Sequence, residues 1–108
     1  MNELKPRTIL AYESLQLVII DFHNATEEEI AAKETLDMAI LQATFEGSID
    51  GKNEKARKAQ ALSLFPELYD QLATISKVAR NFKYALDIAR VEVEMVRTLI
   101  RLEELTKG

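Results

Sequence analysis

The sequence has no cysteine and no tryptophan, and it has only three glycines and two prolines among 108 residues. Without cysteine there can be no disulfide, no thiolate zinc site and no cysteine nucleophile; this suits a reducing compartment, so we expect a cytoplasmic protein. The scarcity of glycine and proline argues against an all-β fold, which needs many tight turns. No apolar run approaches the roughly 18 residues of a membrane helix, so we expect neither a membrane span nor a signal peptide.

What the chain does contain is typical of a folded, helix-rich protein. Apolar residues make up 47% and charged residues 30% of the sequence, and the length predicts one domain, residues 1–108. The net charge is −4, with the acids concentrated in residues 1–50 and most of the bases in residues 51–108. This asymmetry fits either an acidic helix beside a basic one or a basic surface for nucleic acid, and the acidic total favours the first interpretation.

The first half of the chain predicts one long helix over about residues 7–46, because this stretch contains neither glycine nor proline. Thr26 and Glu29 match a capping box, which marks a weak point near Asn24 in this otherwise single helix. Four apolar residues follow a helical spacing, which favours a helix over a strand in this stretch: Tyr12, Leu15, Ile19 and Phe22.

The second half carries a heptad seam, an unbroken alternation of four-residue and three-residue steps. Such a seam is typical of left-handed helix packing, and it predicts a second long helix over about residues 66–106. Pro66 fits the first turn of this helix and Gly108 fits its end. The seam consists of Leu68, Leu72, Ile75, Ala79, Phe82, Leu86, Ala89, Val93, Val96 and Ile100.

The elbow between the two long helices, about residues 47–65, contains two of the three glycines. Gly47 and Gly51 let the backbone leave the first helix, and Asp50 or Ser48 supplies turn hydrogen bonds. Asn53 is a candidate N-cap for a short helix that ends before the second proline. The predicted fold is therefore all-α: a long antiparallel, coiled-coil-like hairpin with a short third helix at its elbow.

The apolar residues at the open end of this hairpin are too many for one stripe on each helix. Residues 9–22 and 91–105 are apolar on several faces, and a helix that is apolar all round must be buried on several sides. We therefore expect a homodimer or higher oligomer in which the open ends form a helical bundle. The predicted dimer interface comprises Ile9, Tyr12, Leu15, Ile19, Phe22, Val93, Val96, Leu99 and Ile100.

The sequence shows no constellation for catalysis or metal binding. His23 is the only histidine, the Glu-x-x-His motif of di-iron bundles is absent, and no serine has a convincing base partner. We interpret His23 as a structural residue. We therefore predict no catalytic residue, no metal, no cofactor and no enzymatic activity.

Four bases cluster in the elbow with few acids to compensate them: Lys52, Lys55, Arg57 and Lys58. They are candidates for contact with a phosphate backbone or with a protein partner. No aromatic residue interleaves with them, so the stacking typical of single-strand binding is not encoded locally. The other interpretation, which we favour, is that the elbow serves only as the turn between helices.

The segment GKNEKARKAQ, residues 51–60, resembles the elbow of a group of small all-helical proteins encoded by phages and prophages. The resemblance covers the whole layout, and this segment is its specific part. The positions that match are Gly51, Lys52, Asn53, Glu54, Arg57, Lys58, Ala59 and Gln60.

The resemblance extends, in size and helical character, to phage recombination accessory proteins, which act beside strand-annealing or strand-exchange proteins. It implies a non-enzymatic assembly or adaptor protein with a protein partner, in phage or prophage DNA recombination or replication. The alternative prediction is a protein that binds nucleic acid without sequence preference through the basic elbow.

Overall fold

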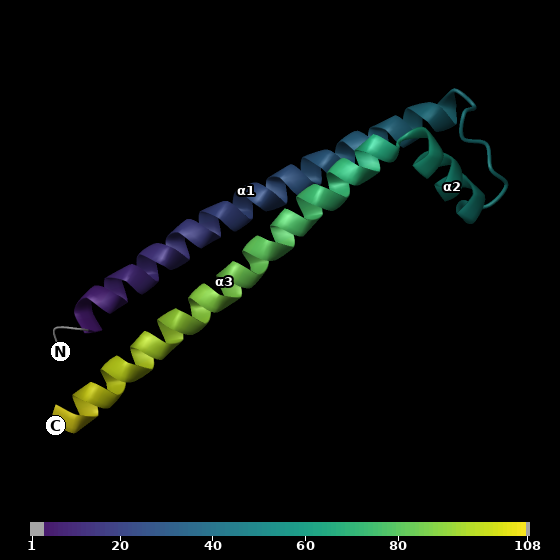
Figure 1. The fold of residues 1–108 in the computed structure, drawn as a ribbon. Coiled ribbons are helices and arrows are strands. Elements are labelled where there is room, and N and C mark those ends of the chain that lie inside the picture. Colours follow the sequence, from purple (N-terminus) through teal and green to yellow (C-terminus); the bar gives the residue numbers. More distant parts are fainter. Residues whose placement is uncertain (1–3, 108) are drawn as a thin grey trace. The chain divides into compact units, whose positions relative to one another are not determined.

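The computed structural model describes residues 4–107, which form three helices (Figure 1). In chain order these are α1 (Leu4–Phe45), α2 (Glu54–Leu64) and α3 (Pro66–Lys107). The prediction of an all-helical chain with two long helices that pack against each other is confirmed. The predicted helix end at Gly108 lies outside the described residues.

The chain divides into two compact units. Unit 1 consists of the chain up to Asn24 together with the chain from Arg80 onward, and unit 2 runs from Ala25 to Ala79. Each unit therefore contains one part of α1 and one part of α3. The single-domain interpretation of residues 1–108 stays a prediction.

Helix α1 is continuous over 42 residues. It passes through Asn24 and Thr26 without a break, so the capping-box sequence begins no new helix, although the division between the units falls at this point. Helix formation is cooperative, and neither glycine nor proline interrupts the ladder of backbone hydrogen bonds here. Threonine hydroxyls inside α1 donate to carbonyl oxygens four residues earlier, as Thr35 does to Ala31 at 2.9 Å.

One face of α1 forms an inner stripe along the helix. Its members are buried or half-buried and follow an unbroken alternation of four-residue and three-residue steps. Leu15 and Phe22 belong to it, whereas Tyr12 and Ile19 are 43% and 46% exposed. Four alanines of this stripe are buried or half-buried in the part of α1 that belongs to unit 2: Ala25, Ala32, Ala39 and Ala43. The inner stripe comprises Leu4, Thr8, Ala11, Leu15, Val18, Phe22, Ala25, Glu29, Ala32, Leu36, Ala39 and Ala43.

The heptad seam predicted for α3 is confirmed, because each of its ten members is buried or half-buried. Pro66 begins the helix, where its missing N–H costs no intrahelical hydrogen bond. Inside unit 1 the seam packs on α1: Ala11, Val93 and Val96 form a buried cluster that Leu15 and Ile100 extend. Val96 is the most deeply buried side chain of the cluster, with 0% exposure.

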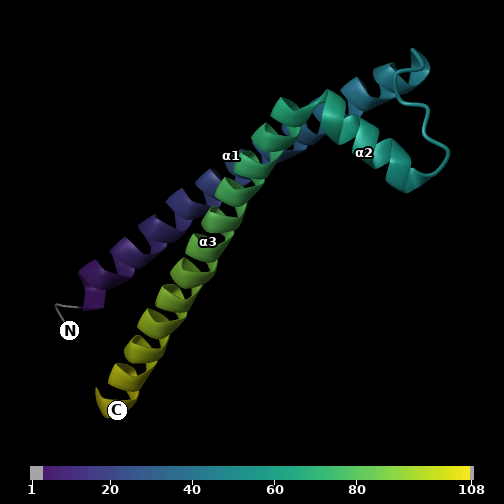
Figure 2. The ribbon, with the colours of Figure 1, turned by 45° about the vertical axis from the view of Figure 1, so that its right-hand side comes forward.

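Unit 2 has a second buried cluster, formed where the elbow meets both long helices (Figure 2). Ala43 of α1, Ile49 of the connecting loop and Ala61 of α2 form its centre. Three partly buried side chains pack around that centre: Ile40, Phe65 and Tyr69. The elbow is thus part of a packed core and not a loose connection.

Candidate functional site

The elbow begins with a Schellman motif at the end of α1. Gly47 has a φ of 86°, the left-handed conformation that glycine adopts without strain. The N–H of Ser48 donates to the carbonyl of Ala43 at 2.9 Å, and the N–H of Gly47 donates to the carbonyl of Thr44 at 3.2 Å. The prediction that Gly47 ends the first helix is confirmed.

Gln60 of α2 holds the loop that leads into this helix, a role that the sequence analysis missed. Its Oε1 accepts hydrogen bonds from the backbone N–H groups of Gly51 at 2.8 Å and Asp50 at 3.1 Å. Its Nε2 donates to Asp50 Oδ1 at 2.8 Å. A side-chain amide can donate and accept at once, so one residue satisfies three groups of the loop.

Asn53 caps α2 as predicted, because its Oδ1 accepts from the N–H of Ala56 at 2.8 Å. Gly51 passes very close to the same helix. A Cβ at this position would lie 2.8 Å from the Cβ of Ala56 and 2.9 Å from the backbone nitrogen of Arg57. Only glycine fits there without a shift of the backbone.

All four bases of the elbow are exposed, but two of them make contacts within the chain. Arg57 Nη1 donates to the carbonyl of Gly51 at 3.1 Å, and therefore helps to hold the loop. Lys58 pairs with Glu54 at 3.3 Å one helical turn earlier, an exposed pair of small energetic value. Lys52 and Lys55 are thus exposed to solvent, whereas the Arg57 side chain is hydrogen-bonded to the loop.

The residues predicted for a dimer interface have different environments. Val93 and Val96 are buried by the chain's own helices, so they fill the core of unit 1 and do not lie on its surface. This part of the prediction is corrected: a position in a heptad seam does not reveal which helix covers it. Leu15, Phe22, Leu99 and Ile100 are half-buried, whereas Ile9, Tyr12 and Ile19 are exposed.

A second apolar row runs along α3, and we call it the outer row. Its members are all exposed and repeat the alternation of four-residue and three-residue steps, and the first six of them each lie two residues after a seam position. Two residues turn a helix by about 200°, so the outer row lies on the side opposite the seam. The outer row consists of Tyr84, Ile88, Val91, Met95, Thr98, Leu102 and Leu105.

The outer row is confined to unit 1. Toward the start of α3 the same positions hold the polar residues Asn81, Lys77, Thr74 and Asp70. Thr98 is the one member of the outer row that is not apolar. The interface predicted from the sequence omitted this row, although its spacing was present in the sequence as a second heptad pattern offset from the first.

Unit 1 also exposes apolar side chains on α1, but less regularly. Leu10, Leu17 and Ile20 lie opposite its inner stripe, and Glu13 interrupts them. On one edge of the unit, Arg7 Nε pairs with Glu92 at 3.1 Å, and Arg7 Nη2 donates to the sulfur of Met95 at 3.2 Å. The outer row of α3 is therefore the most continuous apolar feature on the surface of this unit.

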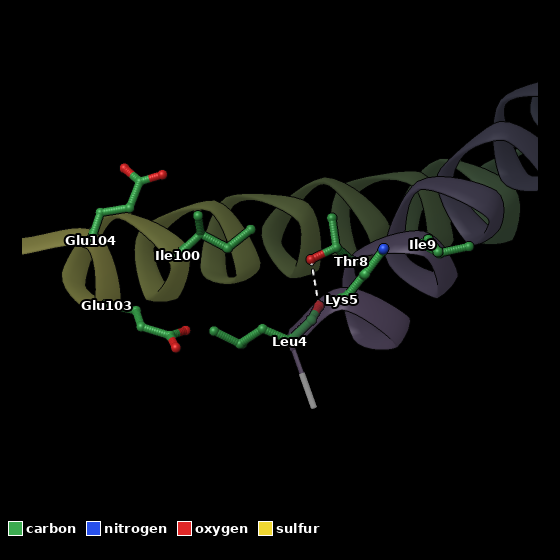
Figure 3. A pocket seen from close by; sticks show the side chains of 7 residues that line it. All are labelled: Leu4, Lys5, Thr8, Ile9, Ile100, Glu103 and Glu104. Carbon is green, nitrogen blue, oxygen red and sulfur yellow. Dashed lines mark hydrogen bonds between the residues drawn. The ribbon is translucent and has the colours of Figure 1, made fainter. Parts of the chain in front are cut away.

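A groove of about 320 Å³ lies between the start of α1 and the last turns of α3 (Figure 3). Leu4 extends from α1 toward α3 there, and Thr8 donates to the carbonyl of Leu4 within the helix. The lining is mostly apolar, with carboxylates at one side. Its residues are Leu4, Lys5, Thr8, Ile9, Ile100, Glu103 and Glu104.

Other chemistry is sparse in residues 4–107. His23 is exposed on α1, and no group of three or more acidic or histidine side chains in this range is placed to hold a metal ion. No helix among these residues is both long and apolar enough to cross a membrane. The same residues contain no buried side-chain nitrogen or oxygen that lacks a hydrogen-bond partner.

Comparison of the chain with protein-family models, with curated proteins and with solved structures finds no match. The resemblance of the elbow segment to phage and prophage proteins therefore stays a prediction from the sequence.

Proposed function

We propose that this protein is a non-enzymatic assembly or adaptor protein that acts through helix–helix association, first with a second copy of itself and then with a protein partner. The observation that carries the proposal is the outer row of α3, which exposes six large apolar side chains in a heptad pattern. Full burial of one such side chain is worth roughly 1.5–3 kcal/mol, so covering a row of them strongly favours association.

The resemblance of the elbow implies an accessory role in phage or prophage DNA recombination or replication. The absence of cysteine fits a cytoplasmic location for this role. The contacts of the elbow support an architectural role for this segment. Four positions of the resembling segment hold the loop itself: Gly51, Asn53, Arg57 and Gln60. These contacts support the interpretation of the segment as the turn between the helices.

Self-association is tested by sedimentation equilibrium over a wide concentration range. We expect a dimer or a higher oligomer. A clean monomer of 12.3 kDa at the highest concentration would contradict the proposal.

The competing function is sequence-independent nucleic-acid binding through the elbow, supported by the exposure of Lys52, Lys55 and Lys58. If these three lysines contact phosphates, the affinity for DNA falls with salt with a log–log slope of about −2 to −3. Fluorescence anisotropy with a labelled oligonucleotide measures that slope. Changing the three lysines to glutamine, while keeping Arg57 because it holds the loop, removes the charges and leaves the fold intact. We expect weak binding that the substitutions do not alter; tight, lysine-dependent binding would favour the competing function.

A further inference from the structure

We infer that the outer row of α3 is a homodimer interface in which the α3 helices of two copies pack antiparallel, with Val91 of each copy opposite Leu102 of the other. This inference rests on the proposed self-association and adds its geometry. The partner that covers the outer row is a second copy of this chain, because the row is complementary to itself in both spacing and charge.

The spacing of the row supplies the first argument. From Ile88 to Leu105 the steps are three, four, three, four and three residues, which read the same in both directions. Two copies related by a two-fold axis therefore match along this length, as an isologous interface requires. The layers are Ile88 with Leu105, Val91 with Leu102, and Met95 with Thr98, and each occurs twice.

The charges beside the row supply the second argument. In this register Glu94 lies beside Arg101 of the other copy, and both side chains are exposed in the monomer. The dimer thus gains two opposite-charge contacts at its rim. Glu94 also pairs with Arg97 of its own helix at 3.5 Å, which keeps the carboxylate on this side of the row.

Two other arrangements also satisfy the apolar pattern, but their charges match less well. The stretch from Tyr84 to Leu102 also reads the same in both directions. This register places Asp87 beside Arg101 of the second copy, but it also places Glu94 beside Glu94 and Glu92 beside Glu92. A parallel pairing places Asp87 beside Glu92 of the second copy, again two like charges. Charge complementarity therefore selects the register that pairs Glu94 with Arg101.

The proposed contact stays inside unit 1. In this register the helices overlap from residue 86 to residue 107, and all of these residues belong to unit 1. Because the outer row faces away from the seam that packs on α1, the core of unit 1 is preserved. The two α3 helices then form the centre of a four-helix assembly with α1 of each copy on the outside.

Cysteine crosslinking tests the geometry directly, because the chain has no cysteine of its own. Val91→Cys and Leu102→Cys are prepared separately and mixed in equal amounts under mild oxidation. We expect a covalent dimer on a non-reducing gel from the mixture and from neither variant alone. In the proposed dimer two Val91 positions are 11 residues apart along the axis, about 16 Å, which is too far for a disulfide. A crosslink of Val91→Cys with itself would overturn the antiparallel arrangement.

Charge exchange tests the register. Glu94→Arg puts like charges beside Arg101 of the second copy and should weaken the dimer about tenfold. Glu94→Arg combined with Arg101→Glu restores the opposite charges and should return the affinity to within about threefold of the original. Asp87→Arg should change little, because in this register Asp87 has no charged neighbour in the second copy. A large loss with Asp87→Arg, or no rescue by the double change, would overturn the register.

A matched pair of leucines separates this inference from the proposed function. Leu102 and Leu17 are both exposed in the monomer, at 54% and 64%, on the outer sides of α3 and α1. We expect Leu102→Glu to give a monomer by sedimentation and Leu17→Glu to leave the dimer intact. If Leu17→Glu alone dissociates the assembly, the α3 interface is wrong while self-association stands. If the original protein is already a monomer, both the interface and the proposed function fail.

Discussion

Units 1 and 2 contain parts of the same two long helices, yet different interactions fix them. Among residues 4–107, twelve of the nineteen exposed large apolar side chains belong to unit 1 and seven to unit 2, although unit 2 has more residues. The interhelical polar contacts of unit 1 centre on Arg7, whereas the elbow of unit 2 is held by a capping asparagine, a glutamine with three hydrogen bonds and two glycines.

This difference suggests a division of labour. In unit 2, Gln60 forms hydrogen bonds with the loop, and the buried core around Ile49 covers the turn. Unit 1 leaves a regular apolar row on α3 exposed, and the proposed function assigns association to this row. In that proposal, unit 1 associates with other chains and unit 2 reverses the direction of the chain.

The largest effect should come from a charge placed in the core of unit 1. Val96→Asp buries a carboxylate at a position with 0% exposure and should cost about 3–5 kcal/mol, enough to unfold a marginal domain. Circular dichroism during urea denaturation measures the loss. Val78→Asp, which changes an exposed valine of the same helix, is the control and should cost less than about 1 kcal/mol. Equal losses for the two variants would mean that the buried cluster of unit 1 does not hold it together.

Next in size is the close approach at the elbow of unit 2. Gly51→Ala places a Cβ 2.8 Å from the Cβ of Ala56 and should cost about 1–3 kcal/mol through overpacking. At Gly47 an added Cβ would have no atom within 4 Å, so Gly47→Ala should lower the stability by only about 1 kcal/mol, through the strain of its positive φ. Thermal melts of the two variants separate these causes. The interpretation fails if Gly51→Ala is as stable as the original protein.

A smaller effect is expected from the glutamine that holds the loop. Gln60→Glu removes the donor to Asp50 and brings two carboxylates together, at an expected cost of about 1–2 kcal/mol. Asp50→Asn in the same chain restores a donor–acceptor pair and should recover part of the loss. A double-mutant cycle from denaturant midpoints measures the coupling. Losses that simply add would show that the two side chains do not interact.

The smallest effect should be at the ion pair of unit 1. Arg7 and Glu92 are 43% and 39% exposed, so solvent screens their attraction, and Arg7→Gln should cost less than about 1 kcal/mol. The loss should shrink further in high salt. Thermal melts at low and high ionic strength provide the measurement. A large, salt-independent loss would show that polar contacts matter as much in unit 1 as in unit 2.

Much of the architecture could be predicted because its signals are local. The absence of glycine and proline predicted α1, and Gly47, Asn53 and Pro66 predicted where the helices end or begin. These signals work because a cap or a turn depends on the few residues around it. The seam of α3 was predictable for a related reason, since its apolar period is unbroken.

The inner stripe of α1 was less predictable. Its sequence is apolar on several faces, so Tyr12 and Ile19 looked as suitable for burial as Ala11 and Val18. The choice depends on which side chains fit against α3, and a one-dimensional pattern does not contain that information. The bonds of Gln60 were missed because they join residues nine and ten positions apart, across a loop whose path the sequence does not specify.

By itself, then, the sequence determined three helices, their ends, the seam of α3 and an excess of apolar residues in the parts that form unit 1. Only the tertiary structure decided which of those residues the chain covers with its own helices, burying Val96 and leaving the outer row of α3 exposed. The physical reason is that helix formation follows from backbone hydrogen bonds and local propensity, whereas burial depends on close packing between segments that are distant in the sequence.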